Sequence, residues 1–189
     1  GDVLSAIGRR FKIPYRLIMR LNSLPSETIY AGRELKVVQG PFRVRIVKET
    51  FSLELWPDEV LVRTFPVAIG KEGSTPAGTY QVQRKQTRPT FYPPPSQRGT
   101  MPVRGPDDPD NPLGSRWIGL GNHLGIHGTN EPDSIGKRVS LGCVRMHNRD
   151  VEFLYDCLVR GARVDIVQGP LDRVEPIVEA AGTEDNGSA

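Results

Sequence analysis

The sequence predicts a mainly β fold of the sandwich or barrel type, preceded by a small α+β unit. Short alternating apolar runs recur from residue 42 onward, which is the pattern of half-buried strands. The 20 glycines and 17 prolines among 189 residues favour short strands and many turns. Residues 1–40 instead show helical spacing and end at Gln39-Gly40-Pro41. The predicted units are therefore residues 1–40, residues 41–169 and a tail of residues 170–189.

Two apolar sets in the first unit recur at helical spacing, and a short alternating run follows them. Pro14 suits the first turn of the second helix, because its ring fixes φ near the helical value and its missing N–H is not needed there. Residues 34–38 read as a strand. The helical sets are Leu4, Ile7 and Phe11 for the first helix, then Leu17, Ile18 and Leu21 for the second.

The second unit opens with strands whose apolar positions we interpret as core. Pro57, Asp58 and Glu59 are turn formers between two of these strands. Near its end, Asn148 to Arg160 is predicted as a helix that closes at Gly161, and residues 163–167 as a last strand. The alternating positions are Val44 and Ile46, then Phe51, Leu53 and Leu55, then Val60 and Val62, then Phe65 and Val67.

A long proline-rich segment interrupts the second unit. Gln86 to Ser115 holds eight of the 17 prolines. Long irregular segments inside a compact domain are commonly functional or disordered. One interpretation is that this segment walls a substrate groove, and the other is a plain surface loop. The tail from residue 170 is acidic and is predicted to be disordered.

The segment from Gly125 to Asn148 carries a cysteine and two of the three histidines among glycines and small polar residues. A thiol attacks a carbonyl as the thiolate, so Cys143 needs a base or a positive field beside it. An imidazole such as that of His127 can accept the thiol proton and return it to a leaving amine. The spacing allows a strand ending at His127, a turn, and a return strand arriving at Cys143. The two side chains are expected to meet across neighbouring strand ends.

The residues around the sulfur fit acyl transfer through a thioester. Gly142 leaves the backbone free to approach a substrate, and its N–H can stand beside that of Cys143 to face an oxyanion. In an extended segment Arg145 lies on the same face as the thiol, where a guanidinium can bind a carboxylate or stabilise the thiolate.

Three other interpretations of these residues stay open. A free cysteine is often a small buried hydrophobe, as Cys157 is predicted to be within its helical pattern. A disulfide between Cys143 and Cys157 would remove the thiol chemistry. His123, His127, Cys143 and His147 form a set of zinc-type ligands, although their spacing fits no finger or ribbon pattern. His147 is otherwise a loop residue ahead of a helix, with Asn148 as its N-cap.

Charge and hydropathy limit the classes of function that the chain can have. The formal net charge of +3 is compatible with anionic wall polymers or nucleic acid, but the basic residues show neither aromatic interleaving nor a nucleic-acid motif. No uncharged apolar run approaches the roughly 18 residues of a membrane helix. The chain begins with Gly and carries no recognisable secretion signal, so a processed or truncated product is expected.

The run IHGTNEPDSIGKRVSLGCVRMHN resembles the active-site signature of the YkuD-type L,D-transpeptidases. The resemblance extends to VLVRTFPVAIGKEGSTPAGTYQV, with its Thr-Pro-x-Gly-x-Tyr turn, and to DNPLGSRWIGLG, and so covers most of residues 42–169. It implies a β-sandwich or barrel catalytic domain. It also implies a location in the cell envelope, periplasmic or extracytoplasmic.

The same resemblance implies a cysteine-dependent peptidoglycan enzyme without metal or organic cofactor. Cys143 matches the nucleophile and His127 the general base, with the Gly128 carbonyl orienting the imidazole. Such enzymes attack the bond after the L-centre of diaminopimelate in a tetrapeptide stem, release D-alanine, and pass the acyl group to an amine. That amine belongs to another stem, giving a 3→3 cross-link, or to a lysine of a wall-anchored protein. The candidates for oxyanion or substrate binding are Gly142, Arg145, Ser140 and Thr129.

One position departs from the family pattern. Many relatives carry histidine before the Gly-Cys pair, where this sequence has Leu141. Any role of that histidine is therefore lost or replaced here, while the nucleophile and base positions are kept.

The first unit resembles a LysM module, a small βααβ fold that binds the N-acetylglucosamine of glycan strands. The resemblance lies in GDVLSAIGRRFKIPYRLIMRLNSL and IYAGRELKV, and it lacks the strand that normally precedes the Gly-Asp pair. The alternative is a helical prop packed on the catalytic domain. Two rival functions for the whole chain also stay open: an L,D-carboxypeptidase using the same cysteine and histidine, and a non-catalytic wall-binding protein.

Overall fold

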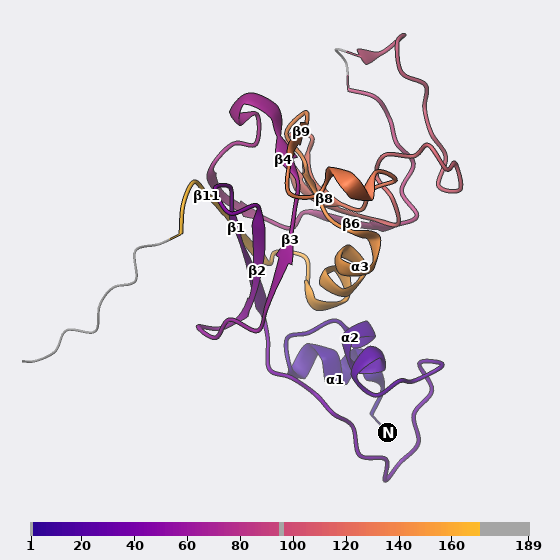
Figure 1. Ribbon diagram of the computed structural model, residues 1–189. Helices are drawn as coiled ribbons and strands as arrows, with labels where there is room; N and C mark the ends of the chain where they lie inside the picture. The colour runs from indigo at the N-terminus through magenta and orange to yellow at the C-terminus, as the bar shows by residue number, and fades with distance from the viewer. Residues whose placement is uncertain (1, 95–96, 171–189) are drawn as a thin grey trace, which may run out of the picture.

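The computed structural model describes residues 2–94 and 97–170, in which two β-sheets, a strand pair and three α-helices form one core (Figure 1). The larger sheet has the strand order β3-β2-β1-β11-β5, with β1 parallel to β11 and the other neighbours antiparallel. Its strands are β1 (Phe42–Val47), β2 (Ser52–Pro57), β3 (Arg63–Pro66), β5 (Gly78–Gln81) and β11 (Arg163–Val167). The predicted mainly β class is confirmed.

The smaller sheet has the order β10-β8-β7-β6, in which β10 runs parallel to β8. A separate parallel pair, β4 with β9, lies next to β10 in space. The strands are β4 (Ile69–Gly70), β6 (Arg84–Thr87), β7 (Arg116–Gly121), β8 (Leu124–His127), β9 (Arg138–Ser140) and β10 (Val144–Arg145), with 3₁₀ turns η1 (Lys71–Gly73) and η3 (Pro132–Ser134).

Helix α3 (Asn148–Cys157) packs against β7 and β8 and helps to enclose the core. Val151 and Leu154 on its inner face are fully buried, as the apolar spacing predicts. The helix ends at Cys157 rather than Arg160, because Leu158 already has an extended backbone (φ −88°, ψ 136°). The predicted last strand is confirmed as β11.

The predicted strand through Val60 and Val62 is wrong. Both side chains are more than half exposed, and β3 begins only at Arg63. Asp58 has a positive φ of 54°, which turns the chain away from β2. The residues that follow therefore form a connection that rejoins β2 only where the Val62 N–H bonds to the Leu55 carbonyl at 3.0 Å, and their apolar side chains stay exposed.

The first unit contains α1 (Leu4–Arg10) and α2 (Tyr15–Leu21), both predicted, with Pro14 as the N-cap of α2 rather than a residue of its first turn. The strand predicted over residues 34–38 is wrong. Lys36 there exchanges two 2.8 Å hydrogen bonds with the side-chain amide of Asn22. An amide side chain thus takes the place of a partner strand. Gly1, where the LysM resemblance lacks its first strand, lies outside the described residues.

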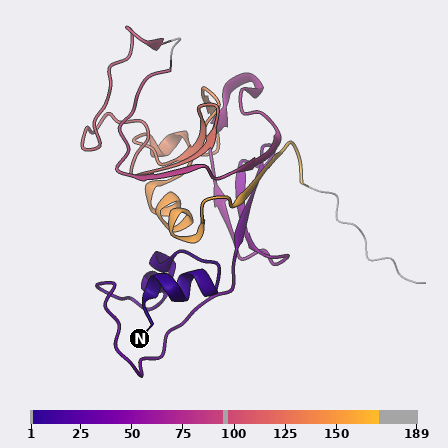
Figure 2. The same ribbon diagram turned by 180° about the vertical axis from the view of Figure 1, so that it is seen from behind.

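The first unit lies against α3, as Figures 1 and 2 show from opposite sides. The Arg20 side chain on α2 donates to the Asp156 carboxylate at 2.9 Å, and its guanidinium stands 5.6 Å from the ring centroid of Phe153. Leu4, Leu17 and Ile18 belong to the same buried cluster as the sheets. Within the described residues, no helix is both long and apolar enough to cross a bilayer.

The proline-rich segment leaves the body after β6 and returns at β7 (Figure 2). Its base is held by Asn111, which is buried and donates to the carbonyls of Pro89 and Gly105, each at 2.8 Å. Two ion pairs link residues within the proline-rich segment, Arg88 with Asp107 and Arg104 with Asp108. The tail predicted to be disordered lies, except for Pro170, outside the described residues.

Candidate active site

His127 ends β8 and lies in a row of side chains across the smaller sheet. Its register partners are Trp117 on β7 and Arg145 on β10, and neighbours in register share one face of a sheet. The rings of Trp117 and His127 stack, with centroids 5.7 Å apart and planes 23° from parallel. Ile126 and Val144, on the other face, are fully buried in the core. The row therefore belongs to the face turned away from the core.

Cys143 directly precedes β10, one residue before Val144, which pairs with Ile126 of β8. The parallel register brings Cys143 beside Gly125 and onto the face that carries His127. The predicted return strand arriving at Cys143 is wrong, because β10 begins after Cys143 and runs parallel to β8. That the Cys143 thiol and the His127 imidazole act as a pair stays a prediction. An added Cβ at Gly125 would lie 2.5 Å from the Trp117 ring, so the indole lies directly over this glycine.

The two cysteines are both free, which excludes the disulfide alternative. Cys157 is buried within α3, as predicted for a small hydrophobe. The Cys143 thiol donates to the carbonyl oxygen of His123 at 3.3 Å. His123 is in the turn between β7 and β8 and has a positive φ of 62°.

The imidazole of His127 has a defined tautomer. Its Nδ1 lies 2.6 Å from the Gly128 carbonyl oxygen. A carbonyl can only accept, so Nδ1 carries the proton and Nε2 keeps a lone pair. Burial lowers the His127 pKa to about 4, which the Gly128 hydrogen bond partly opposes and the positive charge of Arg145 reinforces. The ring is therefore neutral at pH 7.

Burial also raises the pKa of the Cys143 thiol, while the Gly125 backbone N–H and the charge of Arg145 act to lower it. The resting site thus holds a neutral thiol, which is hydrogen-bonded to the His123 carbonyl, and a neutral imidazole. Ionisation of the sulfur requires the proton to move during the reaction.

The turn before Cys143 is held by two hydroxyl groups. Ser140 Oγ donates to the Cys143 carbonyl at 2.6 Å and accepts the Gly142 N–H at 3.1 Å. Thr75 Oγ1 donates to the Gly142 carbonyl at 2.7 Å and accepts the Gly70 N–H at 2.7 Å. Gly142 has a φ of 140°, and a Cβ there would lie 2.9 Å from the Ser74 carbonyl oxygen. Both constraints require glycine at this position.

These bonds correct the expectation for Gly142 and Ser140. The Gly142 N–H, predicted to face an oxyanion, is already donated to Ser140. Ser140 is itself buried and holds the turn rather than a substrate. Across residues 2–94 and 97–170, no acceptor takes the Cys143 N–H, which therefore remains free for an oxyanion.

Arg145 and Thr129 differ in how accessible they are. Arg145 forms an ion pair with Glu131 at 2.7 Å, and its side chain is 16% exposed. Thr129 is buried, and its hydroxyl accepts the Glu131 N–H at 3.0 Å, which holds the turn after His127. Leu141 is 65% exposed beside the thiol turn.

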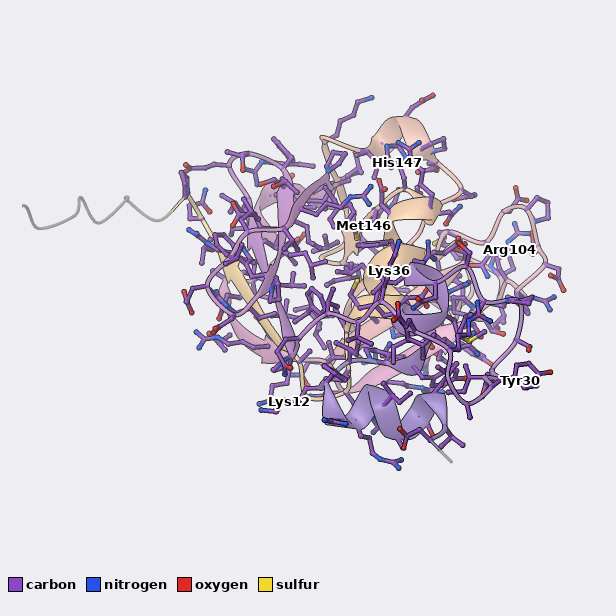
Figure 3. All side chains as sticks on the ribbon, turned by 90° about the horizontal axis from the view of Figure 1, so that it is seen from below. Lys12, Tyr30, Lys36, Arg104, Met146 and His147 are labelled. Carbon is purple, nitrogen blue, oxygen red and sulfur yellow. The ribbon has the colours of Figure 1, made fainter. Side chains whose placement is uncertain are left out.

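The histidines and the cysteine do not form a zinc site. Within the described residues, no three His, Cys, Asp or Glu side chains converge as metal ligands. His147 instead lies near the start of α3 (Figure 3), where it helps to line a hollow of about 540 Å³. This hollow separates the base of the proline-rich segment from the turn after His127. Its polar lining includes Arg88, Asp108, Asn111, Asn130, His147 and Asn148.

The sequence analysis missed three residues of the site: Trp117, Thr75 and Asn148. Trp117 and Thr75 stand inside the segments that resemble the family, which was the available signal. Asn148 was predicted as an N-cap, but His147 is the N-cap of α3 and Asn148 is the first helical residue. The Asn148 side chain instead bonds to the backbone around Thr129.

Comparisons with known proteins agree with this fold and site. The model of the L,D-transpeptidase catalytic domain (YkuD) matches residues 41–166, and that of the LysM domain matches residues 1–38. The L,D-transpeptidase-family protein YkuD of Bacillus licheniformis is 32% identical over 176 residues, covering 88% of this chain and 94% of that protein. ErfK/SrfK of Escherichia coli K12, of the same family, is 41% identical over 158 residues, and the matched region spans 51% of its length and 75% of this chain.

Solved structures share the fold. A crystal structure of an L,D-transpeptidase from Mycobacterium tuberculosis H37Rv superposes with a TM-score of 0.55 at 16% identity, covering 69% of this chain and 59% of that one. The chain thus contains a domain of two main β-sheets whose candidate site includes a cysteine and a histidine. The chain belongs to the YkuD L,D-transpeptidase family and carries a LysM domain ahead of the catalytic domain.

Proposed function

We propose that this protein is a cysteine L,D-transpeptidase of peptidoglycan, with Cys143 as nucleophile and His127 as general base. The proposal is supported by the parallel register of β10 with β8, which brings the segment that begins at Cys143 alongside the end of β8, and by the Gly128 hydrogen bond, which leaves Nε2 of His127 unprotonated. The acyl donor is a tetrapeptide stem, cut after the L-centre of its diaminopimelate.

Acylation begins when His127 Nε2 takes the thiol proton as Cys143 Sγ attacks the carbonyl carbon. The carbonyl oxygen becomes an oxyanion, for which the Cys143 N–H is the available backbone donor. The C–N bond then breaks, and the imidazolium returns its proton to the departing D-alanine nitrogen. The products of this half-reaction are free D-alanine and a thioester on Cys143.

Deacylation reverses the roles. An acceptor amine attacks the thioester carbon and gives a proton to His127 Nε2, the C–S bond breaks, and the thiolate recovers that proton. An acceptor stem gives a 3→3 cross-link, and a protein lysine gives an attached protein. Water as the acceptor gives a carboxypeptidase.

Burial supports a mechanism in which charge appears only during the reaction. A neutral thiol and a neutral imidazole cost little to bury, whereas their ions would lose solvation. The guanidinium of Arg145 favours negative charge on the sulfur and on the nearby oxyanion. We assign the hollow of about 540 Å³ beside Thr129 to part of the substrate groove, walled by the base of the proline-rich segment.

The LysM domain supports a location at the cell wall. We propose that it binds N-acetylglucosamine of the glycan strands and that the protein acts in the periplasm or another extracytoplasmic compartment. The ion pair between Arg20 and Asp156 ties this domain to α3 of the catalytic domain.

Intact-protein mass spectrometry tests the proposed function. Incubation with a disaccharide-tetrapeptide should add the mass of the donor less D-alanine, and the adduct should map to Cys143. Cys143→Ala should give no adduct, whereas the matched control Cys157→Ala, which removes the other free thiol, should acylate normally. A wall-binding protein without catalysis would give no adduct in any form of the chain.

The fate of the adduct identifies the reaction. Addition of a second stem or a lysine peptide should discharge the thioester into a cross-linked product. Discharge into free tripeptide alone, at a rate that added amine does not change, would make the protein a carboxypeptidase.

A further inference from the structure

We infer that Asn148 is a positioning residue of the active site, whose side-chain amide fixes the turn that holds the His127 ring. The role of the turn in catalysis rests on the proposed function. The geometry of the turn does not, so the two are tested separately below.

The amide of Asn148 bonds to three backbone groups from two other segments. Its Oδ1 accepts the N–H of Ser115 at 3.1 Å and the N–H of Thr129 at 3.2 Å. Its Nδ2 donates to the carbonyl of Thr129 at 2.9 Å. Asn148 therefore hydrogen-bonds both the N–H and the C=O of Thr129, as the backbone of a neighbouring strand would.

Two glycines make the space for this amide. A Cβ at Gly114 or at Gly128 would collide with Oδ1 of Asn148. Gly114 also has a positive φ of 60°, which glycine adopts without strain. The amide thus lies between the end of the proline-rich segment and the turn after His127, in a residue that is otherwise exposed to solvent.

The position of Thr129 affects the His127 ring through one peptide bond. Gly128 lies between His127 and Thr129, and its carbonyl carbon and the Thr129 nitrogen belong to the same planar unit. Holding the Thr129 N–H on Asn148 therefore sets the direction of the Gly128 carbonyl, which accepts from His127 Nδ1 at 2.6 Å. If that carbonyl rotated away, the proton would be free to move to Nε2, and the ring would lose the lone pair that takes the thiol proton.

Asn148 contributes little to the helix itself. It is the first residue of α3, its N-cap is His147, and the N-cap makes no side-chain hydrogen bond. An acidic side chain in the first turn of a helix interacts favourably with the helix dipole. Asn148→Asp therefore keeps the helix and the two bonds that Oδ1 accepts, but it replaces the donor to Thr129 by a carboxylate oxygen that repels the Thr129 carbonyl.

The first test reads the tautomer of His127 and needs no substrate. Imidazole ¹⁵N shifts at pH 7, assigned with His123→Gln and His147→Gln variants, should show His127 protonated at Nδ1 in the native protein. Asn148→Ala should shift the ring to a mixture of Nδ1–H and Nε2–H forms, and Asn148→Asp should keep most of the Nδ1–H form. A single Nδ1–H form in Asn148→Ala overturns the inference, whatever its activity.

The second test reads the chemistry by single-turnover acylation with the disaccharide-tetrapeptide. Asn148→Ala should lower the rate constant at saturating donor by about 30-fold, a part of what a well-placed general base supplies. Asn148 also lines the hollow assigned to the substrate groove, so the rate constant at saturating donor, and not the donor concentration for half-maximal rate, reports on the base. Asn148→Asp should recover part of the rate, because it keeps the bond to the Thr129 N–H.

The matched control is Arg149→Ala, the next residue in the same helical turn, whose side chain is 86% exposed. It should leave both the tautomer and the rate unchanged. An equal loss of rate in Arg149→Ala and Asn148→Ala would attribute the effect to the helix start and overturn the inference. Where Asn148→Ala is too unstable to study, a native rate with a mixed tautomer in Asn148→Asp overturns it equally. Failure of the native protein to acylate would instead count against the proposed function and leave the tautomer result intact.

Discussion

Thr75 Oγ1 donates a 2.7 Å hydrogen bond to the carbonyl oxygen of Gly142, the residue directly before Cys143. The two residues are far apart in sequence, and Thr75 is almost fully buried. The same hydroxyl accepts the Gly70 N–H, so it joins the end of β4 to the turn that presents the thiol. Lys48 Nζ donates to the Thr75 carbonyl at 3.3 Å and holds this junction from the other side.

Thr75→Val tests this junction, because it keeps the shape of the side chain and removes the hydroxyl. Two buried backbone groups then lose their partner, which should cost about 1–3 kcal/mol of unfolding free energy. The acylation rate should fall as well, since the Cys143 N–H is no longer fixed toward the oxyanion. Thr75→Ser should restore both quantities. Urea unfolding and single-turnover acylation give the two measurements, and equal behaviour of the Val and Ser variants would contradict this reading of the hydroxyl.

Protonation of His127 should destabilise the fold in acid. Burial lowers its folded-state pKa to about 4, below the ordinary value of 6.5. The unfolded chain therefore binds the proton first, and this contribution to stability, fully present above pH 6.5, is lost as the pH falls toward 4. The loss should be on the order of 3 kcal/mol. Urea unfolding at several pH values should show this dependence in the native chain and a flatter one in His127→Gln, and parallel curves would contradict it.

The reactivity of the thiol should depend on the charge of Arg145. Burial raises the Cys143 pKa, and Arg145 is one of the two groups that lower it. Arg145→Met should therefore move the pH profile of alkylation by iodoacetamide to higher pH. Glu131→Gln breaks the 2.7 Å ion pair but keeps the guanidinium, so it should not raise the profile. The same upward shift in both variants would mean that the ion pair, and not the positive charge, is responsible.

The contact between the LysM domain and α3 should depend on Arg20. This side chain pairs with Asp156 and lies over the Phe153 ring, although it is 42% exposed. Arg20→Met should lower the unfolding free energy by only about 1 kcal/mol but should increase proteolysis in the linker around Gly40. Arg16→Met, on the same helix and stacked only on its neighbour Tyr15, is the control. Equal proteolysis of both variants would show that Arg20 does not hold the domains together.

Local patterns in the sequence were sufficient for the strands that face the core. Val44 and Ile46 alternate toward a buried face. The spacing of His127 and Cys143 predicts a return strand arriving at Cys143, whereas β10 begins after Cys143 and runs parallel to β8. Where an alternating run met no partner, the same reasoning failed. Lys36 bonds to the Asn22 side chain, and Val60 and Val62 keep exposed side chains ahead of β3.

The parts of the site that could not be predicted depend on bonds between distant segments. The Ser140 hydroxyl occupies the Gly142 N–H, and the Asn148 amide reaches across to Ser115 and Thr129. A serine or an asparagine near a reactive cysteine has the same local pattern whether it faces a ligand or the backbone. Only the folded arrangement decides which polar groups are already satisfied.

The stacking of Trp117 on His127 gives the site a built-in optical reporter. The chain has 2 tryptophans, and Trp56 lies on β2 of the other sheet, so Trp56→Phe would leave a single emitter whose ring lies 5.7 Å from the imidazole. A charged imidazole withdraws electron density from an excited indole far more strongly than a neutral one does. Fluorescence of that single-tryptophan protein should therefore dim as the pH falls through the His127 pKa of about 4, which reports the protonation state of the imidazole without any label.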